Sequence, residues 1–356
     1  MRRVPGLGLV AAIAVSGLVL AGCGEAPKES KGGAKEKTFK ACMVTDIGGV
    51  DDRSFNASAW SGMQAAEKED SSIDVEYVTS KAESDYEPNL KQQAQSDCQL
   101  VVAVGGLMRD ATEKIAKQTT DKQFAIVDAS IDADNVYSMQ FNTAQSSFQA
   151  GYLAAASSKT GKVATYGGLK IPPVTIFMDG FYEGVQHYNT VKKKKVQVLG
   201  WNEKSQNGSF AESFTDQSKG KALAENFRSQ GADIVFPVAG GTGLGTAAAA
   251  KASDGKLTTI WVDFDGCESA ADYCSVFLTS VVKNIPDAVK EAVLRAKKGE
   301  KGGSSFLGGL DNKGTFLAPY HQFEDKVDAA LKAEVEQLGK DIISGKIKIQ
   351  SGAQPK

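Results

Sequence analysis

The sequence predicts an α/β protein of two similar lobes, each a parallel sheet flanked by helices, with a ligand cleft between the lobes. Short apolar runs alternate with stretches of helical periodicity, which is typical of a parallel sheet covered on both faces. Six or more such strand–helix units follow one another, too many for one small sheet. About 320 residues remain after a polar N-terminal segment, and this length suffices for two lobes.

In the first half of the chain, the apolar runs are expected to be strands and the periodic stretches helices. The run Leu100–Val104 is apolar throughout, as in a strand buried on both faces. Trp60, Met63 and Ala66 recur at helical spacing and would share one helix face. The expected strands are 39–45, 75–78, 100–104 and 123–127, and the expected helices are 57–69, 86–97 and 110–117.

The alternation restarts after a long expected helix, 144–157. The expected strands are then 162–166, 196–201, 234–238, 257–263 and one near 275–279, and the expected helices are 177–188, 217–230, 246–252, 286–297 and 323–344. This pattern places the first lobe at residues 38–142, with about 267–300 returning to it. The second lobe covers 143–266, with about 301–350 returning to it.

The first 22 residues have the features of a signal peptide: a charged start, an apolar middle and small residues before a cleavage site. The apolar stretch is slightly short for a transmembrane helix. The ending Leu20-Ala21-Gly22-Cys23 resembles the lipobox of bacterial lipoproteins, in which Cys23 takes up the lipid, palmitate included. Residues 23–37 read as a flexible tether. The expected location is the extracytoplasmic face of a bacterial cell membrane.

The charge pattern gives no sign of a nucleic-acid partner. The formal net charge is −2, and the one basic run, Lys192–Lys195, precedes an apolar stretch and reads as an exposed turn before a strand. A metal site is not expected either, because no C-x-x-C spacing occurs and the only histidines are His187 and His321.

The four cysteines other than Cys23 make an even number in an oxidising compartment, which permits disulfides. Cys267 and Cys274 close a short loop and can pair easily. Cys42 and Cys98 can pair if their strands are neighbours. The alternative is four free buried thiols.

Ligands of open α/β sheets bind beyond the carboxyl ends of the strands. The residues just after each expected strand are therefore candidates for a binding site, and small residues that let a ligand or a turn approach the backbone recur among them. They are Asp46, Gly105–Asp110, Gly167–Gly168, Ala239–Gly245 and Asp263–Asp265.

The string Val44–Asn56 (VTDIGGVDDRSFN), with the lipobox upstream, resembles the basic membrane protein family of bacterial lipoproteins. The likeness continues through Val104–Gly106 with Asp110, Phe148–Ala155, Gly231–Gly243, Val262–Asp265 and Leu278–Lys283. It implies a two-lobed periplasmic-binding-protein-like fold of type I and a substrate-binding lipoprotein of an ABC transporter. The implied ligand is a purine nucleoside such as guanosine, inosine or adenosine, captured by cleft closure and passed to a permease. Gly106 and Gly266 depart from the family pattern.

Two aromatic residues are candidate stacking platforms for a purine base. Phe55 lies in a loop between polar residues, where stacking on a base is worth roughly 1–3 kcal/mol; the alternative is an anchor that packs the loop onto the next helix. Phe236 lies within an expected strand and is as well explained as a core residue.

The other candidates for the predicted site are polar residues. Asp46 and Asn56 suit the N–H groups and acceptors of a base edge, although each also suits a turn or a helix cap. Asp110 is a further candidate, with a helix cap as its plain alternative. Asp263 is expected to accept hydrogen bonds from the ribose diol, with Lys283 adding a polar contact.

Asp265 is a sixth polar candidate, because it cannot be separated from Asp263 by sequence alone. No cofactor is expected. An enzyme is disfavoured, because the segment AGGTGLG departs from G-x-G-x-x-G and no G-x-S-x-G elbow occurs. Two alternatives stay open: the same fold with another small ligand, such as a sugar or nucleobase, and a surface adhesion or signalling lipoprotein.

Overall fold

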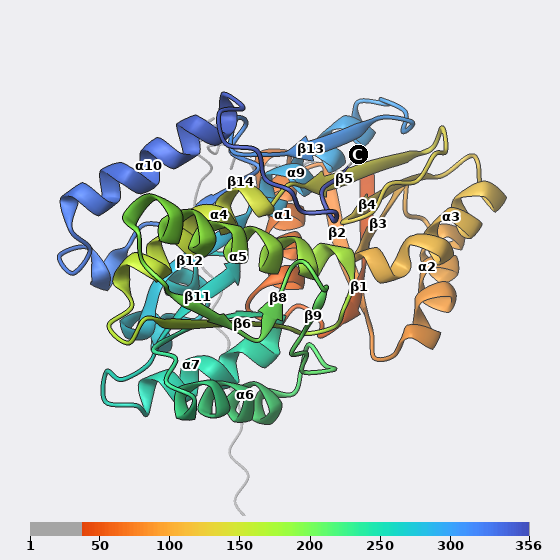
Figure 1. The fold of residues 1–356 in the computed structure, drawn as a ribbon. Helices are drawn as coiled ribbons and strands as arrows, with labels where there is room; N and C mark the ends of the chain where they lie inside the picture. The colour runs from red at the N-terminus through yellow and green to blue at the C-terminus, as the bar shows by residue number, and fades with distance from the viewer. Residues whose placement is uncertain (1–37, 356) are drawn as a thin grey trace, which may run out of the picture. The chain divides into compact units, whose positions relative to one another are not determined.

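The computed structural model describes residues 38–355, which contain two six-stranded sheets (Figure 1). The expected signal peptide at 1–22, the lipidated Cys23 and the tether at 23–37 lie outside the described residues. Between residues 38 and 355, no helix combines the length and the apolar character needed to cross a membrane.

The first sheet is parallel throughout and has the order β13-β5-β4-β3-β1-β2. Side chains alternate between its two faces, as the pleat requires. On β1, Ala41 and Met43 join the core under α1 and α9, and Val44 joins the core on the opposite face with α2 and α3. Its elements are β1 (Phe39–Ile47), α1 (Phe55–Glu69), β2 (Ile73–Ser80), α2 (Tyr86–Gln95), β3 (Leu100–Val104), α3 (Arg109–Gln118), β4 (Gln123–Val127), β5 (Val136–Phe141), α9 (Ile285–Lys297) and β13 (Ser305–Gly308).

The second sheet has the order β14-β12-β11-β10-β6-β7, and only its β12–β14 pair is antiparallel. Helices α4, α5 and α10 cover one face, and α6 and α7 cover the other. Its main elements are α4 (Ala144–Ser157), β6 (Lys162–Gly167), α5 (Pro172–Lys192), β7 (Gln197–Leu199), α6 (Gln217–Ser229), β10 (Ile234–Val238), α7 (Gly243–Lys251), β11 (Thr258–Asp263), β12 (Phe277–Lys283), β14 (Thr315–Leu317) and α10 (Ala329–Ile343).

Short elements join these layers. A small hairpin follows β7, and several single helical turns precede longer helices. They are β8 (Trp201–Asn202), β9 (Asn207–Gly208), α8 (Gly266–Ser269), η1 (Glu83–Asp85), η2 (Gly106–Met108), η3 (Gly240–Thr242), η4 (Ala271–Val276) and η5 (His321–Phe323).

The predicted class of two parallel-sheet lobes is confirmed, but the C-terminal segments are distributed differently from the expectation. Residues 267–300 do not return to the first lobe as a block, because β12 extends the second sheet and only α9 packs on the first. Conversely, β13 lies in the 301–350 segment expected for the second lobe, yet it pairs with β5 at the edge of the first sheet. The described chain therefore passes between the lobes after β5, after β12 and after β13.

Element boundaries differ from the expectation where turn residues decide them. Strand β5 was not expected. The strand expected at 196–201 divides at Gly200, which has a φ of 79°. Helix α5 begins five residues earlier than expected, at Pro172, because prolines are favoured in a first helical turn. The helix expected at 323–344 begins at Ala329, where Asp328 caps it.

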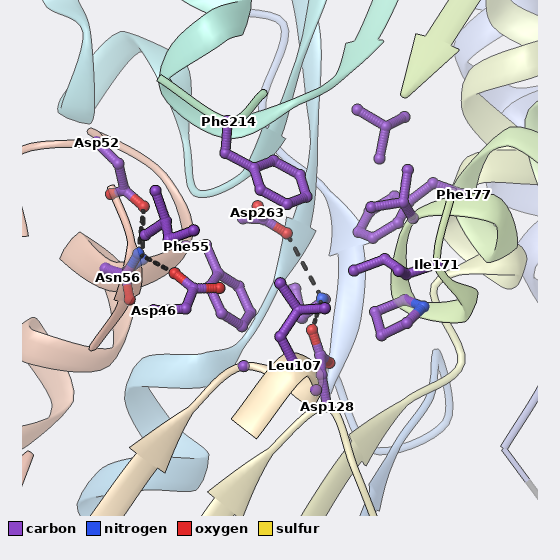
Figure 2. A pocket seen from close by; sticks show the side chains of 17 residues that line it. Asp46, Asp52, Phe55, Asn56, Leu107, Asp128, Ile171, Phe177, Phe214 and Asp263 are labelled. Atoms are coloured by element: carbon purple, nitrogen blue, oxygen red, sulfur yellow. Dashed lines mark hydrogen bonds and ion pairs between the residues drawn. The ribbon is translucent and has the colours of Figure 1, made fainter. Parts of the chain in front are cut away.

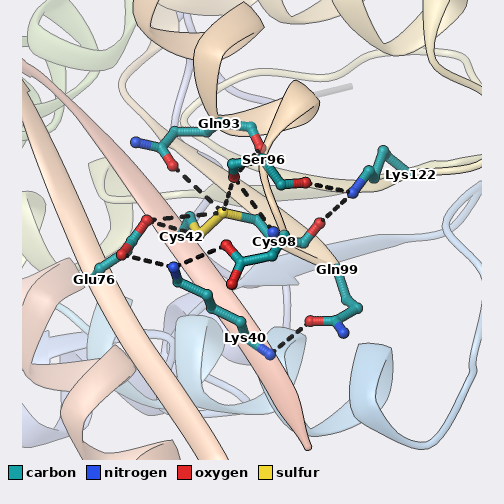
Figure 3. The surroundings of a disulfide bond; sticks show 9 residues. Lys40, Cys42, Glu76, Gln93, Ser96, Cys98, Gln99 and Lys122 are labelled. Carbon is teal, nitrogen blue, oxygen red and sulfur yellow. Dashed lines mark hydrogen bonds and ion pairs between the residues drawn. A yellow bond between two sulfur atoms is a disulfide. The ribbon is translucent and has the colours of Figure 1, made fainter.

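Both expected disulfides are present. Cys42–Cys98 joins β1 to the turn before β3, with Lys40, Glu76 and Gln93 around it (Figure 3). Cys267–Cys274 closes the short loop after β11. The alternative of four free thiols is thereby excluded.

Candidate functional site

A pocket lies between the two lobes, at the carboxyl ends of strands from both sheets (Figure 2). Asp46 stands near the end of β1, Asp128 directly follows β4, and β11 and β12 end in Asp263 and Lys283. The empty volume is about 580 Å³, including space that is open to solvent. This is the position where parallel sheets bind ligands.

Lys283 holds an ion-pair network that joins the lobes. Its Nζ lies 2.7 Å from Oδ2 of Asp128 in the first lobe and 3.7 Å from Oδ1 of Asp263 in the second. Burial by itself lowers the pKa of Lys283, but the charges of Asp128 and Asp263 outweigh it and raise the pKa above 10.5. The side chain therefore carries its positive charge inside the pocket.

Three aromatic rings surround the same ammonium group. Its Nζ lies 5.0 Å from the ring centre of Phe55, 5.1 Å from that of Phe177 and 5.9 Å from that of Phe141. Each distance is within the range of a cation–π interaction. The rings thus compensate part of the hydration that Lys283 loses on burial.

Asp128 and Asp263 both adopt left-handed backbone conformations, with φ values of 66° and 67°. A residue with a Cβ rarely adopts this region, and such conformations are concentrated at functional sites. Aspartate tolerates it better than most residues. In both sheets, the turn that aims a carboxylate at the pocket is therefore conformationally costly.

Asp46, Asp52 and Asn56 form a second polar cluster, on the first lobe. Asp52 accepts hydrogen bonds from the backbone N–H groups of Ser54, Asn56 and Ala57, so it caps the start of α1. Nδ2 of Asn56 donates to Oδ1 of Asp46 at 2.8 Å and to Oδ2 of Asp52 at 3.1 Å. These two donations fix the orientation of the amide and leave its Oδ1 as an acceptor.

The pocket disfavours further negative charge. Burial is the main cause that raises the pKa of Asp46 well above its usual range, with the neighbouring carboxylates adding to it. Burial likewise raises the pKa of Asp52, and it raises that of Asp263 to about 6 although the charge of Lys283 opposes it. Among the described lining residues, four aspartates face one lysine.

Two acceptors in this pocket have no hydrogen-bond partner among residues 38–355. They are Oδ1 of Asn56 on the first lobe and Oδ1 of Asp263 on the second, and both residues are buried. Buried polar atoms are nearly always satisfied in folded proteins. A ligand that donates hydrogen bonds toward both lobes would satisfy them.

Aromatic side chains supply the apolar part of the pocket. Figure 2 shows Phe55, Phe177 and Phe214 around it; they come from the start of α1, from α5 and from the loop before α6. Leu107 and Ile171 add aliphatic surface from each lobe. The pocket therefore combines aromatic rings from both lobes with a buried group of charged side chains.

The structure brings five of the predicted site residues to this pocket: Asp46, Phe55, Asn56, Asp263 and Lys283. Three others lie elsewhere.

Phe236 is fully buried in the core, with its ring 5.4 Å from that of Phe181. Asp110 is 92% exposed on α3 and pairs with Arg109. Asp265 caps α8 and bonds to Nε2 of His321 at 2.7 Å.

Sequence reasoning missed Asp52, Asp128, Phe177 and Phe214. Asp128 directly follows the run QFAIV and could have been found by the same rule that selected Asp46. Phe214 is an aromatic residue among polar loop residues, the signal used for Phe55. Phe177 lies in a helix with many apolar residues, and no local signal separates it from the core.

Comparison with known proteins identifies the family. Residues 39–352 match the family described as ABC transporter substrate-binding protein PnrA-like. A CD4+ T-cell-stimulating antigen of Listeria innocua is 36% identical over 95% of this chain and 96% of that protein. The ABC transporter nucleoside-binding protein BmpA of Lactococcus lactis is 32% identical over 96% of this chain and 98% of that protein.

Solved structures share the fold. A solute-binding protein of an ABC transporter system from Aeropyrum pernix K1 superposes with a TM-score of 0.79 at 26% identity, over 88% of this chain and 93% of that chain. A solute-binding protein from Bacillus halodurans with bound myo-inositol gives a TM-score of 0.60 at 13% identity, over 82% and 98% of the two chains. The second likeness concerns the fold alone.

Proposed function

The chain belongs to the family of PnrA-like substrate-binding proteins of ABC transporters, and from this premise we propose that it captures purine nucleosides for import. The predicted resemblance to the basic membrane protein family is thus confirmed. The members of this family are solute-binding proteins and not enzymes.

The observation that carries the proposal is that Oδ1 of Asp263, buried at the end of β11, has no hydrogen-bond partner among residues 38–355 and only a longer ion-pair contact, 3.7 Å from Nζ of Lys283. A ribose diol can donate two hydrogen bonds to one carboxylate. In the proposed complex, the diol binds Asp263 beside Lys283. Asn56 and Asp46 then face the base edge from the other lobe. Phe55 and Phe214 supply ring faces for the base, and stacking of this kind is worth roughly 1–3 kcal/mol per base.

The excess of carboxylates defines what the pocket rejects. A nucleotide would bring a doubly charged phosphate beside Asp46, Asp128 and Asp263 with Lys283 already paired. Uncompensated buried charge is strongly unfavourable. The proposed ligand is therefore the neutral nucleoside and not its phosphate ester.

Capture is proposed to work by closure of one lobe on the other. Ligand contacts come from both lobes, so the closed arrangement gains free energy that the open one lacks. A scattering profile that stays the same with and without saturating ligand would contradict closure.

Isothermal titration of the mature chain without its lipid tests the ligand. The protein is unfolded and refolded first, to remove carried-over ligand, and is then titrated with guanosine, inosine, adenosine, uridine, ribose and guanosine 5′-monophosphate. We expect purine nucleosides to bind at least tenfold more tightly than ribose and the monophosphate. Absence of heat with every nucleoside, from protein shown to be folded, would sink the nucleoside assignment and favour another small ligand.

Lipid attachment at Cys23 is proposed from the lipobox and from relatives named as lipoproteins, such as one of Pyrococcus furiosus that is 29% identical over 86% of this chain. Growth with a clickable palmitate analogue should label the wild-type protein. Cys23→Ser should abolish the label and release the protein from the membrane fraction. Equal labelling of both proteins would place the lipid elsewhere.

A further inference from the structure

A second cavity adjoins the ligand pocket. Its empty volume is about 770 Å³, against about 580 Å³ for the ligand pocket, both with space open to solvent. The two cavities share five lining residues, three from the first lobe and two from the second. These are Gly106, Leu107, Asp128, Ile171 and Pro173.

Gly106 stands at this junction without a side chain. A Cβ there would lie 2.9 Å from the carbonyl oxygen of Asp128 and 3.4 Å from Cγ of Pro173. A larger residue would therefore press on both lobes at the point where the cavities meet. Glycine therefore allows Asp128 and Pro173 to approach the backbone closely at this shared edge of the two cavities.

The walls of the second cavity are mainly apolar. They include Phe141, Ile176 and Ala129 and, from the C-terminal segment, Ala353 and Pro355. The charged groups that also line it have partners already. Arg109 pairs with Asp110 at 2.7 Å and with Glu113 at 3.3 Å, and Asp128 pairs with Lys283. The cavity therefore suits an apolar group better than a charged one.

The C-terminal wall is fixed to the second lobe and to the segment between the lobes. Oγ of Ser351 donates to Oδ2 of Asp179 at 2.6 Å, and the backbone N–H of Gln350 donates to Glu183 at 2.8 Å. Nδ2 of Asn142, just after β5, donates to Oε1 of Gln354 at 2.9 Å. These hydrogen bonds hold the segment that carries Ala353 and Pro355 in place as a wall of the cavity.

We propose that the second cavity is a subsite for an apolar substituent of the bound nucleoside, attached to the base or to the 5′ carbon of the ribose. This inference rests on the proposed function. Burial of each methylene group strengthens binding by about fourfold. A substituent of four or more carbons that fits the cavity should therefore bind at least tenfold more tightly than the parent nucleoside.

Titration calorimetry with adenosine, N6-benzyladenosine and 5′-butylthio-5′-deoxyadenosine tests the subsite and identifies the point of attachment. We expect one derivative to bind at least tenfold more tightly than adenosine. Ala353→Trp and Pro355→Trp each fill the cavity from the C-terminal segment, so each should remove this gain and leave adenosine affinity within twofold. Ala333→Trp, at an exposed position of α10, is the matched control and should preserve the gain.

The outcomes separate the two proposals. If adenosine itself does not bind, the proposed function fails. If adenosine binds and both derivatives bind equally or more weakly, the subsite is overturned while the proposed function stands. A gain that survives both cavity-filling variants, each confirmed as folded by its melting curve, also overturns the subsite, because the substituent then lies elsewhere.

Discussion

Oγ of Ser54 on the first lobe donates a hydrogen bond of 2.9 Å to Oδ2 of Asp263 on the second. The other oxygen of the same carboxylate, Oδ1, has no hydrogen-bond partner among residues 38–355 and belongs to a pocket-lining residue. One carboxylate therefore joins the lobes through Oδ2, while Oδ1, which lies 3.7 Å from Nζ of Lys283, can still accept a hydrogen bond from a ligand. Several measurable consequences depend on this arrangement.

Ser54→Ala should weaken ligand binding by about tenfold, because the closed form loses a hydrogen bond to a charged acceptor and leaves Oδ2 buried without a donor. Titration calorimetry measures the loss. Ser58→Ala is the matched control: this serine lies in α1, which begins directly after Ser54, is fully buried, and its hydroxyl has no hydrogen-bond partner in the described chain. Equal losses in both variants would assign the effect to α1 packing.

Asp263→Asn should reduce nucleoside affinity by about 10- to 100-fold, since a charge-assisted hydrogen bond contributes about 1.5–3 kcal/mol. Asp265→Asn should leave affinity within twofold, because Asp265 bonds to His321 and caps α8 outside the pocket. Competition with a fluorescent nucleoside analogue measures both variants. If Asp265→Asn weakened binding more than Asp263→Asn does, the diol-binding role would belong to Asp265.

Affinity should fall as the pH decreases below about 6. Burial raises the pKa of Asp263 to about 6, and the proposed hydroxyl donors require its ionised form. Protonation therefore competes with ligand, by at most tenfold per pH unit below 6. Titrations at pH 5, 6 and 7.5 check this. Asp263→Asn should lose this step; an unchanged pH profile in that variant would assign the titration to another group, such as Asp46.

Phe214→Ala should weaken purine nucleoside binding by roughly 5- to 100-fold, from the loss of one stacking face, with little change in melting temperature. Phe236→Leu should lower the stability and leave nucleoside affinity nearly unchanged, because Phe236 packs in the core against Phe177 and Phe181. Its expected effect is about 1–1.5 kcal/mol of unfolding free energy. Paired calorimetric and urea-unfolding measurements separate the two effects. A ligand-binding loss confined to Phe236→Leu would contradict the assignment.

Glu203 should make the protein less stable as the pH rises from about 4.5 to 8. Burial, and then the charge of Glu183, raise its pKa to about 8 in the folded chain. The folded state holds a proton that the unfolded state has released in this window, so stability is greatest below it and is lost toward its upper end. Glu203→Gln should flatten the dependence of urea midpoints measured at pH 5, 7 and 8.5. If the urea midpoints of both proteins changed with pH in parallel, the raised pKa of Glu203 would be contradicted.

The sequence predicts the repeating architecture well, because strand and helix periodicities are local. It also predicts the post-strand carboxylates Asp46 and Asp263, since the ends of parallel strands meet at one edge. Local periodicity could not predict that β12 belongs to the second sheet and β13 to the first. Both are short, and their own sequences do not show that β12 pairs with β11 while β13 pairs with β5, which lies far away in sequence.

The aromatic residues show the same limit. Phe55 and Phe214 stand among polar residues, so a local signal exists for both, although only Phe55 was selected. Phe177 and Phe236 sit within regular elements and have similar surroundings in sequence. Phe177 lines the pocket and Phe236 does not, because α5 turns one of its faces toward the cleft.

The anchored C-terminal segment has a practical consequence. Ala353 and Pro355 form part of a cavity wall, and Gln354 bonds to Asn142 where the chain passes between the lobes. If the lobes close on the ligand as proposed, we expect an affinity tag joined at this end to disturb that closure. A small environment-sensitive fluorophore attached there would instead report each capture event as a change in emission, without a label inside the ligand pocket.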